Sequence, residues 1–457
     1  MKDHLETIKN PQVTMEERLE SLRFLEAERS AIETGIAGES VPRAAREINN
    51  HIHTVYSFSP YTPSMAALRG RDAGLSAAGS VDHDSAAAAE EMLAACAIVG
   101  IGGCVGFEVR ASFATGPGAG AFAGRKLNNP DSEGIAYMTV QGIPRQEQGR
   151  VRDFLKPIQE ERIKRTAAMA DAAGQILREA GLEPIDFDRD VYGKSMAARG
   201  GEITERHLLA AVAEKFIKKY GKGREITRGL REHLGLEAPP KIASLLADAG
   251  NPHYLYDLLG ILKPGFLPRI FIQPGEAEAI PVEQVTAFAN GIGAIPAYAY
   301  LGDVGESPTG DKKAERFEDA YLDELFEALV RLGYRAVTYM PPRNTEAQLR
   351  RVQRLCAEWG LMEISGVDIN SSRQSFNCPE VLLPPFRHLI DTTWALIAHE
   401  RLSSEDKRYG LFSPENPLKN APLGERLAVY ARAGLDLDLK HPEESIFRIK
   451  KAISEGR

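Results

Sequence analysis

Two histidines spaced two residues apart carry the clearest chemistry in this sequence. His51 and His53 flank the β-branched Ile52, and the chain turns soon afterwards through Ser57 and Pro60. Successive side chains on a β-strand alternate between its faces, so both imidazoles point to the same side. Neutral imidazoles that converge on one point are common ligands of divalent metals. The pair predicts a metal site at the end of a strand, with two histidines on an exposed strand as the alternative.

Further candidate ligands stand at the ends of the next two predicted strands. A strand over 75–81 leads into Asp82 and His83, and a strand over 104–109 carries Glu108. Helical patterns separate these strands, which is typical of a parallel sheet. In a barrel built this way, the carboxyl ends of the strands open at one mouth. We therefore expect these side chains to meet the two histidines there.

The same alternation of strands and helices returns later in the chain. A strand predicted over 361–369 ends in Asp368 and Asn370, which share a strand face as the two histidines do. The helix before it begins with a capping box, formed by Thr345 and Gln348. Between the two groups of strands the rhythm is different, because apolar residues recur at helical spacing over long stretches. This change predicts a helical lobe inserted into an α/β barrel.

The predicted organisation therefore has five parts. They are an N-terminal helical arm at 1–45, a first part of the barrel at 46–149, the helical insertion at 150–255, a second part of the barrel at 256–378 and a mixed, mainly helical extension at 379–457. A glycine-rich stretch at 115–124 has the spacing of a dinucleotide-binding loop, but no helix clearly follows it. A loop over the mouth is the favoured interpretation of that stretch.

Bulk composition limits the class of protein. The chain has 457 residues, of which 43% are hydrophobic and 26% charged, as in ordinary globular proteins. Its net charge of -8 does not indicate a nucleic-acid partner, although a local basic groove stays open as an alternative. The four cysteines form no C-x-x-C pair, which suits a reducing compartment.

Membrane attachment is not expected either. The longest apolar run, 94–107, is broken by glycines and falls short of the ~20 residues that span a bilayer. The N-terminal residues are polar and lack the apolar core of a secretion signal. We therefore expect a cytoplasmic protein with no membrane partner, whose oligomeric state the sequence does not fix.

Taken together, these motifs resemble the PHP (polymerase and histidinol phosphatase) family. The likeness covers roughly residues 46–375 and rests on four motifs in order: His51-Ile-His53-Thr54, Asp82-His83-Asp84, Gly106-Phe-Glu108 and Gly366-Val-Asp368-Ile-Asn370. The insertion resembles that of small phosphoesterases in this family, which act on nucleotides and short RNA ends. The resemblance implies a distorted (β/α)7 barrel with up to three metals at its C-terminal mouth.

The match to the family's metal ligands is selective. All four ligands of the first metal are present, as His51, His53, Glu108 and Asp368. The family usually has an aspartate where Phe58 stands, and histidines where Ile295 and Asn370 stand. A further histidine is expected near Tyr137 and is not there. The resemblance therefore implies about one divalent ion per chain, and this ligand set suits Mn, Fe or Zn.

Catalytic and substrate-binding roles follow from the same comparison. His83 usually binds the third metal of the family, and without its partners we predict a general acid or base, oriented by Asp82 or Asp84. Guanidinium groups bind phosphate in a bidentate manner. The residues predicted to hold a small anionic substrate are Arg110, Arg206, His207, Asn370 and Arg373.

Three functions stay open from the sequence. The first is a single-metal hydrolase that acts on a phosphate ester of a small substrate or nucleotide. The second is a degenerate member of the family that binds metal or ligand without catalysis. The third is a hydrolase of a different bond. Because the ligands of one site are all retained while those of the others are replaced, we favour the first over full loss of activity.

Overall fold

Seven strands form one sheet in the computed structural model of the protein, which describes residues 2–33, 41–116, 120–304 and 316–455. The order of the strands in the sheet follows their order in the chain. The strands are β1 Ile48–Ile52, β2 Ala77–His83, β3 Gly102–Ser112, β4 Ile135–Gln141, β5 Ile295–Ala299, β6 Ala336–Tyr339 and β7 Met362–Ser365. Every residue of β1 and of β3 is buried, because helices cover one side and barrel-filling side chains the other.

The sheet closes on itself between β1 and the segment that follows β7. A parallel bridge joins Ile52 to Ile369 across this seam. Next to it, the side-chain oxygen of Asn49 accepts the N–H of Val367 at 3.0 Å, and its amide donates to the Val367 carbonyl at 3.1 Å. One side chain thus replaces the ladder bonds that two short strands cannot make there. The predicted α/β fold, a distorted seven-stranded barrel, is confirmed.

The distortion lies in β4. This strand pairs antiparallel with both β3 and β5, whereas the other neighbouring pairs in the sheet are parallel. Local sequence patterns did not indicate a strand over residues 135–141. Because β4 runs the opposite way, the start of the strand, not its end, lies at the mouth of the barrel.

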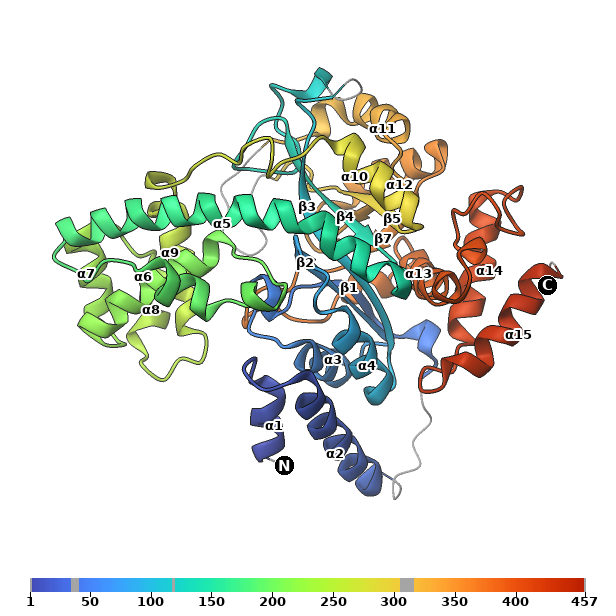
Figure 1. Ribbon diagram of the computed structural model, residues 1–457, viewed down its shortest axis with the longest axis horizontal. Helices are drawn as coiled ribbons and strands as arrows, with labels where there is room; N and C mark the ends of the chain where they lie inside the picture. The colour runs from blue at the N-terminus through green and yellow to red at the C-terminus, as the bar shows by residue number, and fades with distance from the viewer. Residues whose placement is uncertain (1, 34–40, 117–119, 305–315, 456–457) are drawn as a thin grey trace.

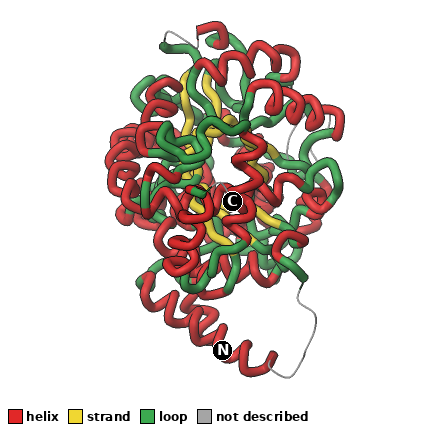
Figure 2. The backbone as a smooth tube through the Cα atoms, turned by 90° about the vertical axis from the view of Figure 1, so that its right-hand side faces the viewer, coloured by secondary structure: helices red, strands yellow, loops and turns green. Residues whose placement is uncertain are grey.

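Helices surround the sheet, as Figures 1 and 2 show. They are α1 Lys2–Lys9, α2 Met15–Glu33, α3 Pro63–Asp72, α4 Ala89–Val99, α5 Gln148–Glu179, α6 Glu205–Tyr220, α7 Glu225–Leu234, α8 Pro240–Ala247, α9 Tyr254–Gly265, α10 Val282–Ile292, α11 Leu322–Arg331, α12 Glu346–Trp359, α13 His388–Glu405, α14 Leu423–Leu435 and α15 Pro442–Ser454. The capping box predicted for α12 is confirmed, since Thr345 and Gln348 bond each other's backbone N–H groups. None of the helices in the described part of the chain has the length and hydropathy needed to cross a membrane.

Ser85 begins a helical pattern over 85–97, and the sequence predicts it as the N-cap of that helix. Ser85 does not cap α4, which begins at Ala89. Its hydroxyl donates instead to the carbonyl of Gly200 at 2.7 Å, in the chain that leads into α6. The residue before it, Asp84, has a φ of 46°, in the left-handed region that residues with a Cβ atom rarely adopt. The turn after β2 is therefore shaped by contacts with the helical segment rather than by local capping.

The hydrophobic core has two main parts. The larger lies between the sheet and its covering helices, and the smaller contains buried residues from Met169 to Ile270, contributed mainly by α5 to α9. α5 belongs to both, because Leu155 and Ile158 pack in the first and Ala173 and Leu177 in the second. In Figure 1 this helix crosses the face of the barrel, and α6 to α9 gather around its far end. The boundaries at 150 and 255 stay predictions.

Candidate metal centre

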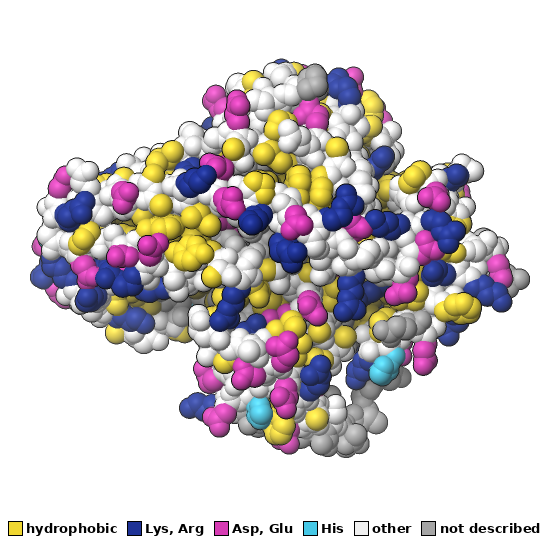
Figure 3. Space-filling model, in the orientation of Figure 1, with side chains coloured by type: hydrophobic (Ala, Val, Ile, Leu, Met, Phe, Trp, Pro, Cys, Tyr) yellow, Lys and Arg dark blue, Asp and Glu magenta, His cyan; other side chains and the backbone are white. Residues whose placement is uncertain are grey.

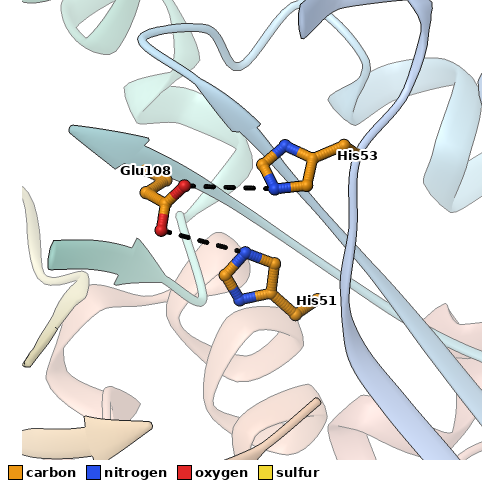
Figure 4. Close-up of side chains that lie close together, drawn as sticks. All are labelled: His51, His53 and Glu108. Atoms are coloured by element: carbon orange, nitrogen blue, oxygen red, sulfur yellow. Dashed lines mark ion pairs between the residues drawn. The ribbon is translucent and has the colours of Figure 1, made fainter. Parts of the chain in front are cut away.

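Two imidazoles and one carboxylate converge at the barrel mouth. His51 and His53 come from the end of β1, and Glu108 comes from β3, two strands away. The Nε2 atom of His51 lies 4.0 Å from one oxygen of Glu108, and that of His53 lies 3.9 Å from the other. Figure 4 shows both rings turned toward this carboxylate. All three residues are buried, so their polar atoms must find partners within the protein or in a bound ion.

The geometry of this group fits a metal ion. Its three ligand atoms lie within 4.8 Å of one another. Two ligands bound to one ion, each at about 2.0 to 2.2 Å, can be separated by up to roughly 4 Å, and the imidazole nitrogens lie 4.0 and 3.9 Å from the carboxylate oxygens here. Two imidazoles with carboxylates are ligands that Zn, Mn and Fe accept. Among the described residues this is the one such group of three or more potential ligands.

Asp368 extends the group on the side of β7. One carboxylate oxygen of Asp368 lies 3.2 Å from Nε2 of His53, and the side-chain amide of Asn370 donates to the same oxygen at 2.7 Å. Asn370 thus orients Asp368. Gly366 lets this segment approach β1, because a Cβ atom there would lie 2.6 Å from the Cβ of His51. We refer to His51, His53, Glu108 and Asp368 as the histidine cluster.

A chain of hydrogen bonds behind His53 fixes its tautomer. The hydroxyl of Ser57 donates to Asp82 at 2.6 Å, and its oxygen lies 3.1 Å from Nδ1 of His53. Because the only hydroxyl proton is given to Asp82, the serine oxygen must accept the proton on Nδ1. The lone pair of His53 is then on Nε2, which faces Glu108 and Asp368. Such an outer partner raises the basicity of a ligating imidazole.

This arrangement changes the role predicted for Asp82. Asp82 is buried and also accepts hydrogen bonds from the backbone N–H and the hydroxyl of Thr54, both at 2.6 Å. Its carboxylate therefore points away from His83 and is not available to orient it. Asp84 does not orient His83 either, because one of its oxygens bonds Arg162 at 2.5 Å. Alternation of faces along β2 puts Asp82 and His83 on opposite sides, and Asp84 lies beyond the strand, in a turn.

His83 itself lies at the mouth, as predicted. Its Nδ1 atom is 2.9 Å from Glu108, and its ring centroid is 4.5 Å from that of His53. About a quarter of the side chain, 24%, is exposed. Glu108 rather than an aspartate thus holds this imidazole beside the histidine cluster.

Burial and charge shift the pKa values of this group in different directions. Burial lowers the pKa of His51 and, together with the positive charges of His53 and Arg162, holds the pKa of His83 well below its usual value. Burial also opposes protonation of His53, but the hydrogen bond and charge of Asp368 outweigh it and raise its pKa. Burial raises the pKa of Glu108. Burial therefore favours at His51 the neutral imidazole that metal ligation requires, whereas Asp368 favours the protonated form of His53, which would lose that proton to bind a metal.

Asp368 stays ionised for a related reason. Burial alone would raise its pKa, but the hydrogen bond to His53 and the charges of His53, His51 and Arg206 hold it well below the usual range. The site thus keeps at least one full negative charge at neutral pH.

A second buried polar cluster lies on the other side of His83. Arg110 on β3 bonds Glu278 at 2.7 Å, and Arg165 on α5 bonds the same carboxylate at 2.6 Å. Glu205, at the start of α6, lies 2.7 Å from Arg165 and 3.2 Å from Arg162. The arginine cluster, as we define it, consists of Arg110, Arg162, Arg165, Asp84, Glu205 and Glu278. It joins the barrel to the helical segment through three cations and three carboxylates.

The predicted substrate-binding residues fall into different environments. Arg110 is 4% exposed and committed to carboxylates, and Arg373 forms an ion pair with Asp257. His207 accepts the backbone N–H of Thr204 at 3.0 Å and so caps α6. These three side chains are therefore engaged in structural contacts. The structure does not bring them together around the histidine cluster.

Arg206 is the exception among the predicted arginines. It is half-buried, and one guanidinium nitrogen donates to the carbonyl of Asn370 at 3.2 Å. In the described part of the chain its guanidinium forms no ion pair, although its charge lowers the pKa of Asp368. Arg206 thus keeps donors for an anion beside the histidine cluster.

Aromatic side chains stand at two positions where the sequence resemblance leads one to expect metal ligands. Phe58 has a φ of 72°, an unusual conformation for a residue with a Cβ atom. Its ring packs against His207, with centroids 4.9 Å apart, and against Tyr256, with centroids 5.9 Å apart. It therefore connects the mouth to the helical segment instead of binding a metal. Tyr137 faces His83, with ring centroids 5.8 Å apart.

Comparisons with known proteins were made for the whole chain. No family model and no curated protein matches the sequence. Among solved structures, it is similar to a protein assigned as a metal-dependent phosphoesterase from Bifidobacterium adolescentis, with 17% identity and a TM-score of 0.47 over 74% of this chain and 92% of the other. An amidohydrolase from Chromobacterium violaceum with bound sulfate gives 18% identity and a TM-score of 0.46, over 75% and 95%. This likeness is too distant to show what the present chain binds.

Proposed function

We propose that the protein is a metal-dependent hydrolase that cleaves a phosphate ester of a small anionic substrate. The observation that carries the proposal is the convergence of His51, His53 and Glu108, with Asp368 beside them, at the mouth of the barrel. These residues would hold one divalent ion. When bound, such an ion polarises a phosphoryl oxygen and lowers the pKa of a bound water.

The residues around the histidine cluster fit the remaining tasks. His83 is held against Glu108 at 2.9 Å and is partly exposed at the mouth, and we assign proton transfer to it, as a neutral imidazole whose low pKa makes it a weak base. Arg206 has spare guanidinium donors on the opposite side, toward Asn370. Glu205 is not available for such work, because three arginines surround it and hold its pKa well below the usual range against the effect of burial.

One observation favours hydrolysis of a different bond as the second candidate. Of the three arginines predicted to bind phosphate, Arg110 and Arg373 are used in ion pairs, whereas Arg206 forms none among the described residues. An amide or another less highly charged substrate needs fewer cations than a phosphate ester does.

The surface charges do not indicate a nucleic-acid substrate. On the face in Figure 3 the basic and acidic side chains are interspersed, with no extended basic surface.

The test is metal analysis of the purified protein, followed by a screen of the metal-loaded protein against phosphomonoesters, phosphodiesters and amides. Turnover of a phosphate ester that disappears with His51→Ala supports the proposal. Turnover of amides alone favours the second candidate. Metal binding without turnover of any of the three classes indicates a protein that has kept the site but lost the reaction.

A further inference from the structure

A tyrosine at the mouth of the barrel has a hydroxyl group that nothing described so far uses. Tyr137 lies near the start of β4, the strand that runs against its neighbours. In the antiparallel ladder it stands directly opposite Arg110, while Thr139 stands opposite Glu108. Residues that are directly opposite share a face of the sheet, so Tyr137 points to the same side as Glu108 and lies nearer the mouth.

The backbone of Tyr137 is held on both sides by one side chain. Asn128 accepts the N–H of Tyr137 at 2.7 Å and donates to its carbonyl at 2.7 Å. The same amide also donates to the carbonyl of Ala299 on β5. Asn128 thus fixes this residue between the two strands, and a fixed backbone is what a preorganised hydrogen-bond donor requires.

The hydroxyl of Tyr137 is open. The residue is half-buried, and among the described residues its hydroxyl has no hydrogen-bond partner and is not completely shielded from solvent. Its ring lies 5.8 Å from that of His83, centroid to centroid. Burial raises the pKa of Tyr137 to about 12, against the opposing charge of Arg110, so the group keeps its proton at neutral pH. It is a donor without an acceptor beside the histidine cluster.

We propose that the Tyr137 hydroxyl binds the substrate directly, donating a hydrogen bond to an anionic oxygen held at the histidine cluster. The inference rests on the proposed function and adds a residue to it. A phosphoryl group at the mouth presents oxygens on several sides. His83 and Tyr137 face one side of the cluster and Arg206 the other. Tyr137 thus supplies a neutral donor where Arg110, bonded to Glu278, cannot reach out.

The experiment compares inorganic phosphate binding by three Mn-loaded proteins in a titration calorimeter. Tyr137→Phe removes the hydroxyl but keeps the ring against His83, so phosphate should bind about 10- to 100-fold more weakly. Metal content and the thermal midpoint should stay as in the unaltered protein. Tyr220→Phe is the matched control, because its hydroxyl is buried without a partner in the helical segment.

The outcomes separate this inference from the proposed function. If the unaltered protein binds phosphate or turns over a phosphate ester and Tyr137→Phe does so equally well, the role of Tyr137 is wrong and the proposed function stands. If the unaltered protein does neither, the proposed function fails and the role of Tyr137 fails with it. An equal loss in Tyr220→Phe would show a general effect of removing a hydroxyl and would also overturn the inference.

Discussion

The histidine cluster and the arginine cluster are both buried at the same mouth, yet their charges are balanced in opposite ways. In the arginine cluster each guanidinium has a carboxylate at 2.5 to 2.7 Å, and three cations face three anions. In the histidine cluster the imidazole and carboxylate atoms stand 3.2 to 4.0 Å apart. With neutral imidazoles, Glu108 and the partly exposed Asp368 leave negative charge that a bound cation would compensate.

The difference separates buried polar groups that stabilise the fold from those that can bind an ion. A buried ion pair that is complete holds two segments in register and offers nothing to a ligand. A buried group of lone pairs directed at one point is incomplete until an ion fills it. Distance between oppositely charged groups, rather than burial or charge alone, therefore separates the two clusters.

The largest expected effect comes from removing a ligand of the histidine cluster. His53→Ala takes away an Nε2 atom that faces both carboxylates, so metal content should fall from about one ion per chain to nearly none. The fold should persist, since the ligand lies above the core at the end of β1. Metal analysis and circular dichroism check the two statements. Full metal content in this variant would contradict the assignment.

Removing a cation from the arginine cluster should act on stability instead. Arg162→Met leaves Asp84 and Glu205 buried without their shared partner, and the free energy of unfolding should fall by about 3 to 5 kcal/mol. Urea unfolding measures the change. Arg228→Met removes an exposed ion pair with Glu225 and should cost at most about 1 kcal/mol. An equal fall in the free energy of unfolding in the two variants would show that the arginine cluster does not stabilise the fold more than an exposed ion pair does.

The two aspartates on either side of His83 act on different clusters, because Asp82 supports His53 through Ser57 and Asp84 belongs to the arginine cluster. Asp82→Asn weakens the acceptor that fixes the tautomer of His53 through Ser57, so metal affinity should fall about 10- to 100-fold. Asp84→Asn breaks the pair with Arg162 and should lower stability while leaving metal affinity unchanged. Metal titrations and urea unfolding of both variants test this. The idea fails if Asp82→Asn binds metal as tightly as the unaltered protein.

The smallest effect concerns the pH dependence of stability near the arginine cluster. Burial, with the charge of Arg162, lowers the pKa of His207 to about 3. The unfolded chain, with a histidine pKa near 6.5, therefore binds more protons between about pH 3 and 6.5, and stability contributed here is lost as the pH falls through that window. His207→Gln keeps an acceptor for Thr204 in the capping position and removes the titration.

Measurement of the unfolding free energy against pH should show a slope for His207→Gln that is less steep by up to about 1.4 kcal/mol per pH unit. His441→Gln, on the exposed surface, is the matched control and should leave the slope unchanged. Identical slopes for the unaltered protein and His207→Gln would show that this histidine is not held neutral by its surroundings.

Much of the barrel could be predicted from local patterns. Alternation of strands and helices identified β1, β2, β3 and β7, and the capping box located the start of α12. β4 could not be predicted in this way, because Ile135 to Gln141 pairs with strands that are distant in sequence, and no helix follows it to complete the alternation. Its antiparallel direction is set by β3 and β5 rather than by its own residues.

The candidate site was predictable in part for a similar reason. Residue type and spacing pointed to His51, His53 and Glu108, because strand ends of a barrel share one mouth. The ion pairs of Arg110 and Arg373 were not predictable, since their partners Glu278 and Asp257 are 168 and 116 residues away. The motif carried one clue to the support of His53, as the turn after it contains Ser57.

Anomalous diffraction from crystals of the Mn-loaded protein would show whether the histidine cluster holds a single divalent ion. We expect one strong anomalous peak per chain, within bonding distance of Nε2 of His51, Nε2 of His53 and a carboxylate oxygen of Glu108. A fully loaded protein without a peak at these atoms, or with further peaks of equal height at the mouth, would contradict it.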